Sequence, residues 1–527
     1  MNLIDALIDL DPSFDWRQLK REWAYRLSWP PDAIAMTSAL LVGSDAYRRL
    51  ASPPSGQCWP PHGSSVDAWE RAVGETGARL AASARFEARP RYSKLPSDLR
   101  ALSDAILAEK ASELRELREN WGWVKALATL HAAADHACAG LGLPPRGEHL
   151  ELEVTTNGLL SESGSMARFP VHRARVLPKM RTPQVGVTLR SFSHHAAFDR
   201  SPLDVRYQIV SRLVEGDDET VNVLIVPWPK SIEPRHFVPV AVGSETGSRI
   251  PGVREFEFSP DACDVGELGR IVAAARAMLG TVHGLVLPES ALAEAEVAAV
   301  ADAARAEGVR FLLTGVRGRK SNFARLAVLV GSGYPPIDQP KHHRWVLNDS
   351  QIRQYHLGSR LHPRFRWAAS IEIKPRCANL LVGNGWLTLS HVICEDLART
   401  GPAIDLIRAA GPTLVIALLA DGPQLTHRWS ARYATILADD PGSSVLTVTS
   451  LGMAERSKPS NQAGSRAVAL WKDSHTGTLP IELAHGSAAI ALTLSALRVT
   501  EYTADTRSDG GMAACLTLSG VHQIRIP

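Results

Sequence analysis

The stretch WLTLSHVICEDLARTGPAIDLIRAAGPTLVIALLA, residues 386–420, decides the fold of the C-terminal half of this chain. Its two apolar runs, 387–393 and 414–420, have the length of buried strands, and Gly411-Pro412 ends the helical pattern between them. Strands that are apolar throughout are typical of a sheet whose faces are covered. The stretch therefore predicts an α/β fold in which helices cover a sheet of buried strands.

Cys394 directly follows the first of these predicted strands. A sulfur in that place lies at the edge of the sheet, near a helix N-terminus, where backbone N–H groups and the helix dipole favour the thiolate. This is how a nucleophile is presented. The alternative is a small buried apolar side chain, whose pKa the carboxylates of Glu395 and Asp396 would raise.

Glu289 occupies the same kind of place. Residues 282–287 predict another buried strand, which Pro288-Glu289 ends, and an Ala-rich helix (291–308) and a third strand (309–314) follow. A partly buried glutamate at the carboxyl edge of a sheet can act as a general base near neutral pH. Alternatively, Glu289 is an acid that the dipole of the following helix stabilises.

Lys341 lies in the run QPKHHRW, residues 339–345. A lysine near such an edge would stabilise an oxyanion as a point charge, whereas a lysine in a basic surface loop would have no chemical role. The interpretation of Lys341 depends on its place in the chain, after Glu289 and before Cys394.

This order resembles that of the carbon–nitrogen hydrolase (nitrilase) superfamily, over about residues 204–500. Its members carry a Glu-Lys-Cys triad on a four-layer αββα sandwich. The Glu follows a proline, the Lys lies in a Lys-x-His motif, and the Cys stands two residues before an acid. The corresponding residues of this chain are Pro288-Glu289, Lys341-His342-His343 and Cys394-Glu395-Asp396. The resemblance implies the αββα fold and a thiol hydrolase that acts on a non-peptide C–N bond of an amide or nitrile.

The resemblance also implies roles for individual residues. Glu289 would take the proton of Cys394, Lys341 and a backbone N–H would hold the oxyanion, and water would hydrolyse the resulting thioester. A supporting acidic residue is expected, for which Glu372 and Glu395 are the candidates. The expected substrate is a small molecule, and the family's habit of dimerising implies a homodimer.

A second alignment places Gln354, in the run QYHL, at the lysine position. That alignment would break the triad and leave a binding or signalling module with a nitrilase fold and no turnover. Such a module would be similar to the nitrilase-like domains found with some bacterial reverse transcriptases of phage defence.

Composition and motifs exclude several other classes of protein. The six cysteines are scattered without a CxxC pair, which argues against a zinc ribbon or a disulfide framework. The dinucleotide, Walker, HExxH and GxSxG motifs are missing, so we expect no cofactor and no metal. An acidic N-terminus, the lack of a membrane-spanning apolar stretch and an Ala- and Arg-rich composition predict a cytoplasmic bacterial protein without a membrane partner.

The pattern along the chain divides it into four parts. Residues 1–180 predict a mainly helical accessory domain of unknown role, and 181–203 predict a connecting segment. The carbon–nitrogen hydrolase domain is expected at 204–500, followed by a C-terminal tail at 501–527.

The interval between Lys341 and Cys394 is longer than in members of the family, so it carries an insertion. Residues 341–376 of this interval are rich in Lys and Arg. They predict either a solvated, charged surface loop or a surface that binds nucleic acid or another anionic ligand.

Overall fold

The computed structural model shows two compact units, which we describe one at a time. Within the described residues, no helix combines the length and the apolar composition needed to cross a membrane. The predicted connecting segment, 181–203, lies outside these residues. The structure describes residues 1–10, 14–51, 53–57, 59, 66–82, 90–138, 204–210, 213–214, 219–241, 252–331, 333–375, 377–383, 386–399, 407, 412–439, 442–458, 463–500 and 512–526.

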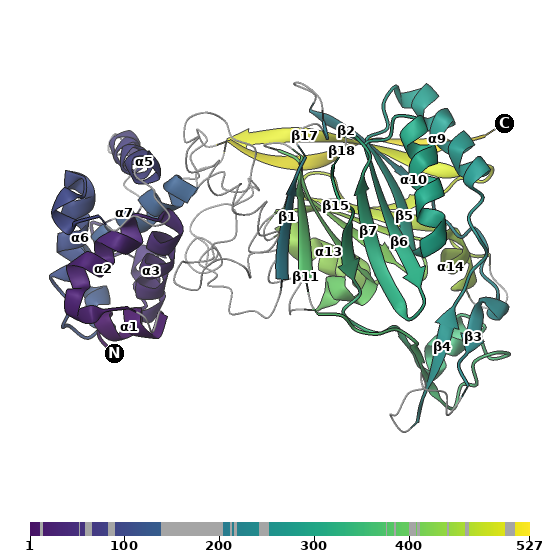
Figure 1. Cartoon of the computed structure of the whole chain (residues 1–527), viewed down its shortest axis with the longest axis horizontal. Helices are drawn as coiled ribbons and strands as arrows, with labels where there is room; N and C mark the ends of the chain where they lie inside the picture. The colour runs from purple at the N-terminus through teal and green to yellow at the C-terminus, as the bar shows by residue number, and fades with distance from the viewer. Residues whose placement is uncertain are drawn as a thin grey trace. The chain divides into compact units, whose positions relative to one another are not determined.

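The N-terminal unit is built of helices, as the sequence predicts (Figure 1). Helix α7 packs against α3, α5 and α6, while α1 and α2 pack against α3. Trp23, Trp29 and Trp123 are buried in this unit, and the Trp23 indole donates a hydrogen bond of 2.9 Å to Ser103. The elements are α1 (Leu3–Leu10), η1 (Trp16–Gln18), α2 (Leu19–Leu27), α3 (Pro30–Gly43), α4 (Tyr47–Ala51), α5 (Val66–Ala82), η3 (Tyr92–Lys94), α6 (Ser97–Leu107), η4 (Leu117–Glu119) and α7 (Trp121–Cys138).

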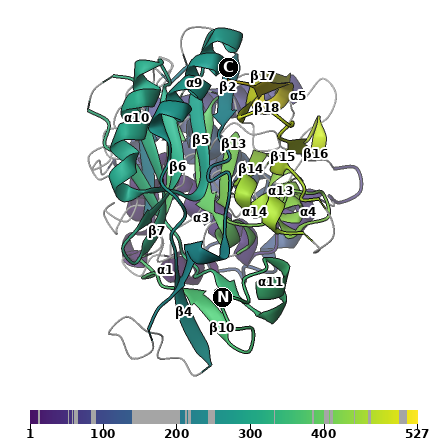
Figure 2. The same cartoon turned by 90° about the vertical axis from the view of Figure 1, so that its right-hand side faces the viewer.

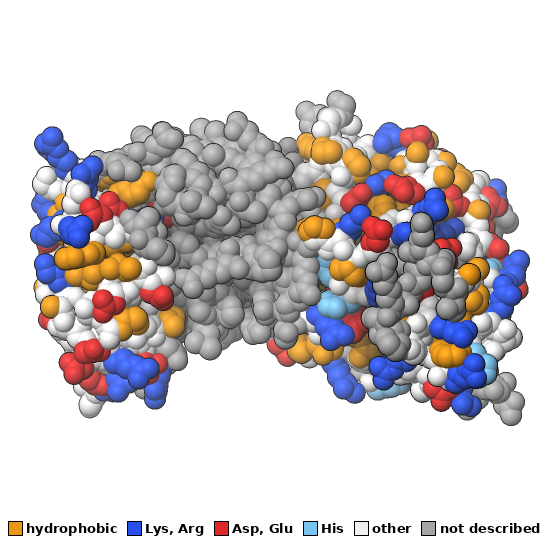
Figure 3. All heavy atoms as spheres, turned by 60° about the horizontal axis from the view of Figure 1, so that its bottom comes forward, with side chains coloured by type: hydrophobic (Ala, Val, Ile, Leu, Met, Phe, Trp, Pro, Cys, Tyr) orange, Lys and Arg blue, Asp and Glu red, His pale blue; other side chains and the backbone are white. Residues whose placement is uncertain are grey.

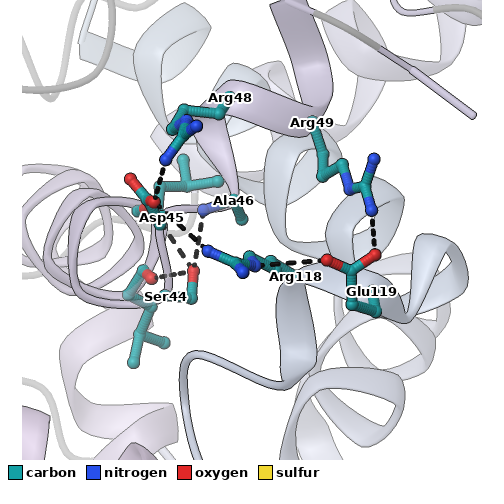
Figure 4. A network of polar contacts seen from close by, with 9 residues as sticks. Ser44, Asp45, Ala46, Arg48, Arg49, Arg118 and Glu119 are labelled. Atoms are coloured by element: carbon teal, nitrogen blue, oxygen red, sulfur yellow. Dashed lines mark hydrogen bonds and ion pairs between the residues drawn. The ribbon is translucent and has the colours of Figure 1, made fainter.

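A network of ion pairs links the segment between α3 and α4 to η4 (Figure 4). Asp45 pairs with Arg48 at 2.9 Å and with Arg118 at 3.4 Å, and Glu119 pairs with Arg118 at 3.2 Å and with Arg49. These side chains are largely in contact with water, where ion pairs add little to stability. The apolar core therefore holds this unit together.

The second unit contains two large sheets that face each other. One has the strand order β11-β12-β13-β14-β15-β16, and the other has the order β18-β17-β2-β5-β6-β7-β8. Strands β12, β13 and β14 are parallel, and so are β2, β5 and β6. Strands β13 and β14 contact β5 of the other sheet, and β12 contacts β7 and β8.

The chain reaches the second unit after β1 (Asp204–Ile209). The strands of the first sheet are β11 (Cys377–Val382), β12 (Thr388–Ile393), β13 (Leu414–Leu419), β14 (Ser444–Thr449), β15 (Ala467–Asp473) and β16 (Gly477–Glu482). Those of the second are β2 (Thr220–Ile225), β5 (Gly284–Ala293), β6 (Phe311–Gly318), β7 (Ser321–Val328), β8 (Ile337–Pro340), β17 (Ala489–Thr500) and β18 (Met512–Ile524).

Helices cover both sheets. In Figure 2, α9 (Val265–Leu279) and α10 (Val297–Ala306) lie over the second sheet, where they contact β2, β5 and β6. Helix α13 (Trp429–Asp439) packs on β14 and β15 of the first sheet. The buried residues of α9 recur at helical spacing, and Asp264 caps its first turn by accepting the Glu267 N–H at 2.8 Å. The predicted four-layer αββα sandwich is confirmed.

The insertion after Lys341 forms part of a small third sheet with the order β3-β4-β10-β9. Phe237, Phe256 and Trp367 are buried in the apolar cluster of this sheet. The insertion is therefore a folded element with its own core and not a solvated loop. Its neighbourhood comprises η7 (Pro234–His236), β3 (Phe237–Pro239), β4 (Val253–Phe258), β9 (Val346–Leu347), α11 (Asp349–Gln354) and β10 (Arg366–Ala369).

Part of the predicted C-terminal tail, 501–527, is a strand instead. Strand β18 lies beside β17 at the edge of the second sheet. Cys515, Leu516 and Ile524 are buried there, and removing these side chains from water favours the paired strand over a free chain. The prediction of a tail is therefore wrong for this segment.

Candidate active site

The backbone of Glu289 is fixed by an irregularity in β5. The register between β5 and β6 shifts at this point, opposite Gly315, and Ser290 takes a left-handed φ of 56°. A Cβ atom on Gly315 would lie 2.4 Å from the Cα of Glu289, so only glycine fits. Arg317 donates to the carbonyl oxygens of Ser290 and Ala291 at 3.0 Å each. Gly315 and Arg317 thus set the direction in which Glu289 leaves the strand.

The carboxylate of Glu289 accepts three hydrogen bonds. Lys341 Nζ and Asn322 Nδ2 donate to Oε1 at 2.5 and 2.7 Å, and the backbone N–H of Ala420 donates to Oε2 at 2.9 Å. The side chains of Lys341 and Glu289 are only 1% and 0% exposed. Each buried charge therefore depends on the other for stabilisation.

Lys341 follows β8 in a loop that Asp396 holds. The Asp396 carboxylate accepts the backbone N–H of His342 at 3.0 Å and lies 2.6 Å from Nδ1 of His343. Burial alone would lower the pKa of Lys341, but the charge of Glu289 and its hydrogen bond with Lys341 raise it, and the pKa lies above its usual value. Lys341 is therefore a cation at neutral pH.

Cys394 directly follows β12, begins a 3-10 turn (Cys394–Ala398) and has a left-handed φ of 46°. Burial and the carboxylates of Glu289 and Asp421 raise the pKa of its thiol well above the usual range, although Lys341 and a hydrogen bond from the Ala420 N–H lower it in part. The expectation that this turn favours a thiolate is therefore wrong. The sulfur is protonated at rest because it is buried beside two carboxylates.

A second buried polar cluster surrounds Asp421, which directly follows Ala420. The Asp421 carboxylate accepts hydrogen bonds from the Tyr355 hydroxyl at 2.8 Å, from Arg428 at 2.7 Å and from the Trp429 indole at 2.8 Å. Burial and the charge of Asp421 raise the pKa of Tyr355, which is therefore a neutral donor. This cluster lies close enough to Cys394 for the charges to interact.

The structure brings Glu289, Lys341 and Cys394 together, and all three share contacts with one another or with the Ala420 N–H. Gln354 does not take the place of Lys341. It lies in α11 with an exposed side chain that donates to Ser457 Oγ at 2.6 Å.

The two candidates for a supporting acid lie outside this group. The Glu372 side chain is 60% exposed and pairs with Lys374, and the Glu395 side chain is 40% exposed and pairs with Arg399. Carboxylates with so much access to water have little influence on a buried lysine. The support for Glu289 comes instead from Asn322 and the Ala420 N–H.

Some of the basic residues of the insertion are paired with acids. Arg344 binds Glu255 at 2.9 Å and Arg353 binds Asp349 at 2.9 Å. On the face seen in Figure 3, Lys and Arg side chains are intermixed with Asp and Glu side chains. These two ion pairs indicate a structural role for Arg344 and Arg353. Within the described ranges, no three His, Cys, Asp or Glu side chains are grouped as a metal site.

Sequence reasoning missed several residues of this region. Asp421 follows a buried strand, as Cys394 does, so the same rule applied to β13 would have found it. Asn322 and Tyr355 carry no such signal, because each reaches its partner from an element remote in the chain.

Comparisons with known proteins give a partial likeness. No protein-family model and no curated protein matches this chain. It is similar in part to solved structures of the nitrilase superfamily. An amidase from Nesterenkonia sp. has 13% sequence identity, with 54% of this chain and 92% of that chain covered and a TM-score of 0.32. Saccharomyces cerevisiae Nit3, a member of branch 10 of the nitrilase superfamily, has 12% identity, 54% and 92% coverage and a TM-score of 0.33. The C. elegans NitFhit protein has 12% identity, 48% and 55% coverage and a TM-score of 0.29.

Proposed function

We propose that this protein is a thiol hydrolase that cleaves a non-peptide C–N bond of a small amide or nitrile. The observation that carries the proposal is the buried ion pair of Glu289 and Lys341 beside the thiol of Cys394. Such a group supplies a nucleophile, a base and a cation at one point. The same three residues carry the sequence motifs that resemble those of the carbon–nitrogen hydrolase superfamily.

In the first half of the reaction on an amide, Sγ of Cys394 attacks the carbonyl carbon while Glu289 accepts the thiol proton. A thiol that is protonated at rest requires such a base. Lys341 Nζ and the backbone N–H that follows Cys394 would stabilise the oxyanion, and one such donor contributes about 3 kcal/mol in comparable sites. The proton then passes from Glu289 to the nitrogen, the amine leaves, and a thioester remains.

In the second half, a water molecule replaces the amine. Glu289 takes a proton from this water as its oxygen attacks the thioester carbon. The carboxylic acid leaves, and the proton returns from Glu289 to Sγ. Asn322 and the Ala420 N–H would hold the carboxylate in one orientation through both halves.

The proposal is tested by measuring ammonia or amine release from a panel of small aliphatic and aromatic amides and nitriles. We expect turnover by the wild-type protein and none by Cys394→Ala. Cys263→Ala is the matched control, because Cys263 and Cys394 are each 8% exposed. The proposal is wrong if the folded wild-type protein hydrolyses no member of the panel, or if Cys394→Ala retains the wild-type rate.

A further inference from the structure

Tyr355 connects the insertion to the candidate active site. It follows α11 and is 2% exposed, and its hydroxyl donates to Oδ1 of Asp421 at 2.8 Å. Asp421 is the neighbour of Ala420, whose N–H donates to Glu289 and also to the sulfur of Cys394. Tyr355, a residue of the insertion, is therefore connected through Asp421 to the Ala420 N–H, the donor that Glu289 and Cys394 share.

Asp421 is held at both its side chain and its backbone. Arg428 and Trp429 donate to the carboxylate at 2.7 and 2.8 Å, and the Thr449 hydroxyl donates to the Asp421 carbonyl oxygen at 2.6 Å. A carboxylate that accepts several hydrogen bonds in a buried site has one orientation. The direction of the neighbouring Ala420 N–H is fixed with it.

We propose that Tyr355 is a positioning residue of this site: it clamps Asp421 and thereby holds the turn whose Ala420 N–H contacts Glu289 and Cys394. The inference rests on the proposed function and deepens it, because it gives the insertion a part in the reaction. The insertion then takes part in the reaction through a neutral tyrosine, while its Arg344 pairs with Glu255 on β4 of the small sheet.

The charges that face Cys394 determine whether a substitution nearby raises or lowers the pKa of its thiol. Glu289 comes from β5, Lys341 from the loop after β8 and Asp421 from the end of β13. Asp421 favours the thiol, and the donors on its carboxylate, Tyr355 and Arg428, reduce that effect. Asp396, in the turn after Cys394, faces Lys341.

The test is the rate of iodoacetamide alkylation of Cys394 as a function of pH, followed by peptide mass spectrometry. Tyr355→Phe removes one donor, leaves the Asp421 charge less compensated and should move the profile to higher pH, with slower labelling at neutral pH. Asp421→Asn removes the charge and should move the alkylation profile to lower pH. At a fixed pH below the pKa of Cys394, alkylation should become on the order of tenfold faster for each unit by which that pKa falls. Asp302→Asn, on the exposed side of α10, is the control and should match the wild type.

Opposite shifts in the two variants are the result that supports the inference, because a merely structural role would change both in the same direction. If Asp421→Asn fails to fold, an upward shift in Tyr355→Phe at an unchanged melting temperature supports the inference, because a general structural defect would lower the melting temperature as well. Wild-type profiles in both variants would overturn this inference and leave the proposed function standing. Opposite shifts in a protein that hydrolyses no amide or nitrile would overturn the proposed function alone.

Discussion

Two cysteines of this protein have the same small exposed fraction, and their surroundings differ. Cys394 directly follows β12 and Cys263 precedes α9, and each is 8% exposed. Burial and the carboxylate of Glu296 raise the pKa of Cys263 to about 12, and burial and Glu289 raise that of Cys394 in the same way. Burial and a neighbouring acid are therefore common to both and indicate no function.

The difference lies in the cation and the base. Cys394 interacts with Lys341, which is itself paired with Glu289, and it receives a hydrogen bond from the Ala420 N–H. Near Cys263, Arg317 is bound to Glu296 and to backbone carbonyl oxygens, so it is a structural cation. A buried lysine and carboxylate that can exchange a proton with the sulfur distinguish the candidate nucleophile from an ordinary buried thiol.

The largest expected effect is that of Lys341→Met, which removes the buried lysine that has no counterpart near Cys263. Glu289 would remain as a buried charge without its partner, which costs about 3–5 kcal/mol, and hydrolysis should be abolished. Urea denaturation and amine release measure the two effects. Arg325→Met breaks the more exposed pair with Asp338 and should cost much less. Equal losses in the two variants would contradict a special role of the buried pair.

Glu289→Gln should separate hydrolysis from ionisation. Because the carboxylate of Glu289 raises the pKa of Cys394, its removal should lower that pKa and let the thiolate form at lower pH beside Lys341. Alkylation of Cys394 near neutral pH should then become faster while amine release is lost. The pH profile of Cys263 should not move. Slower alkylation of Cys394 in this variant would show that Glu289 does not act on the sulfur through its charge.

Gly315→Ala tests whether the close approach of the Glu289 backbone to Gly315, at the register shift of β5, is needed for hydrolysis. The added methyl group would displace Glu289, and overpacking of this kind costs about 1–3 kcal/mol. We expect a loss of stability together with a fall in hydrolysis. In Gly269→Ala, on α9, the new Cβ meets no atom within 4 Å, and helix propensity predicts a gain of about 0.5–1 kcal/mol. An unchanged rate in Gly315→Ala would contradict the account of this strand.

The smallest expected effect concerns the surroundings of Cys263. Asp264→Ala removes the cap of α9 and should lower stability by about 1 kcal/mol. It also removes one of the charges that raise the pKa of Cys263, so alkylation of that cysteine should begin at slightly lower pH. Hydrolysis should be unchanged. Slower hydrolysis, measured under conditions in which all of the variant is folded, would show that the region around Cys263 takes part in the reaction.

The sequence predicts the parts of this molecule that depend on local pattern. Short apolar runs predicted β5, β12 and β13, and polar residues after the runs 282–287 and 387–393 identified Glu289 and Cys394, although β5 continues past Glu289 to Ala293. The resemblance to a family identified Lys341 and the αββα layers. The choice of Lys341 over Gln354 was open in the sequence, and the structure places Lys341 beside Glu289.

The parts that sequence reasoning missed depend on contacts between distant elements. Asn322 lies on β7 and reaches Glu289 only because β5, β6 and β7 are neighbours in one sheet. Tyr355 reaches Asp421 because the insertion folds as a small sheet, which its basic composition concealed. The protonated state of Cys394 depends on burial beside two carboxylates, and a helix N-terminus inferred from sequence suggested the opposite.

The central claim is that Cys394 forms a thioester with substrate, and the most direct measurement is the mass of that intermediate. The wild-type protein is mixed with an amide that it hydrolyses, quenched in acid within milliseconds and digested for peptide mass spectrometry. We predict that the peptide containing Cys394 gains the mass of the acyl group, that the Cys263 peptide does not, and that hydroxylamine removes the added mass. Turnover without an acyl group on Cys394, or with the acyl group on another residue, would contradict the account.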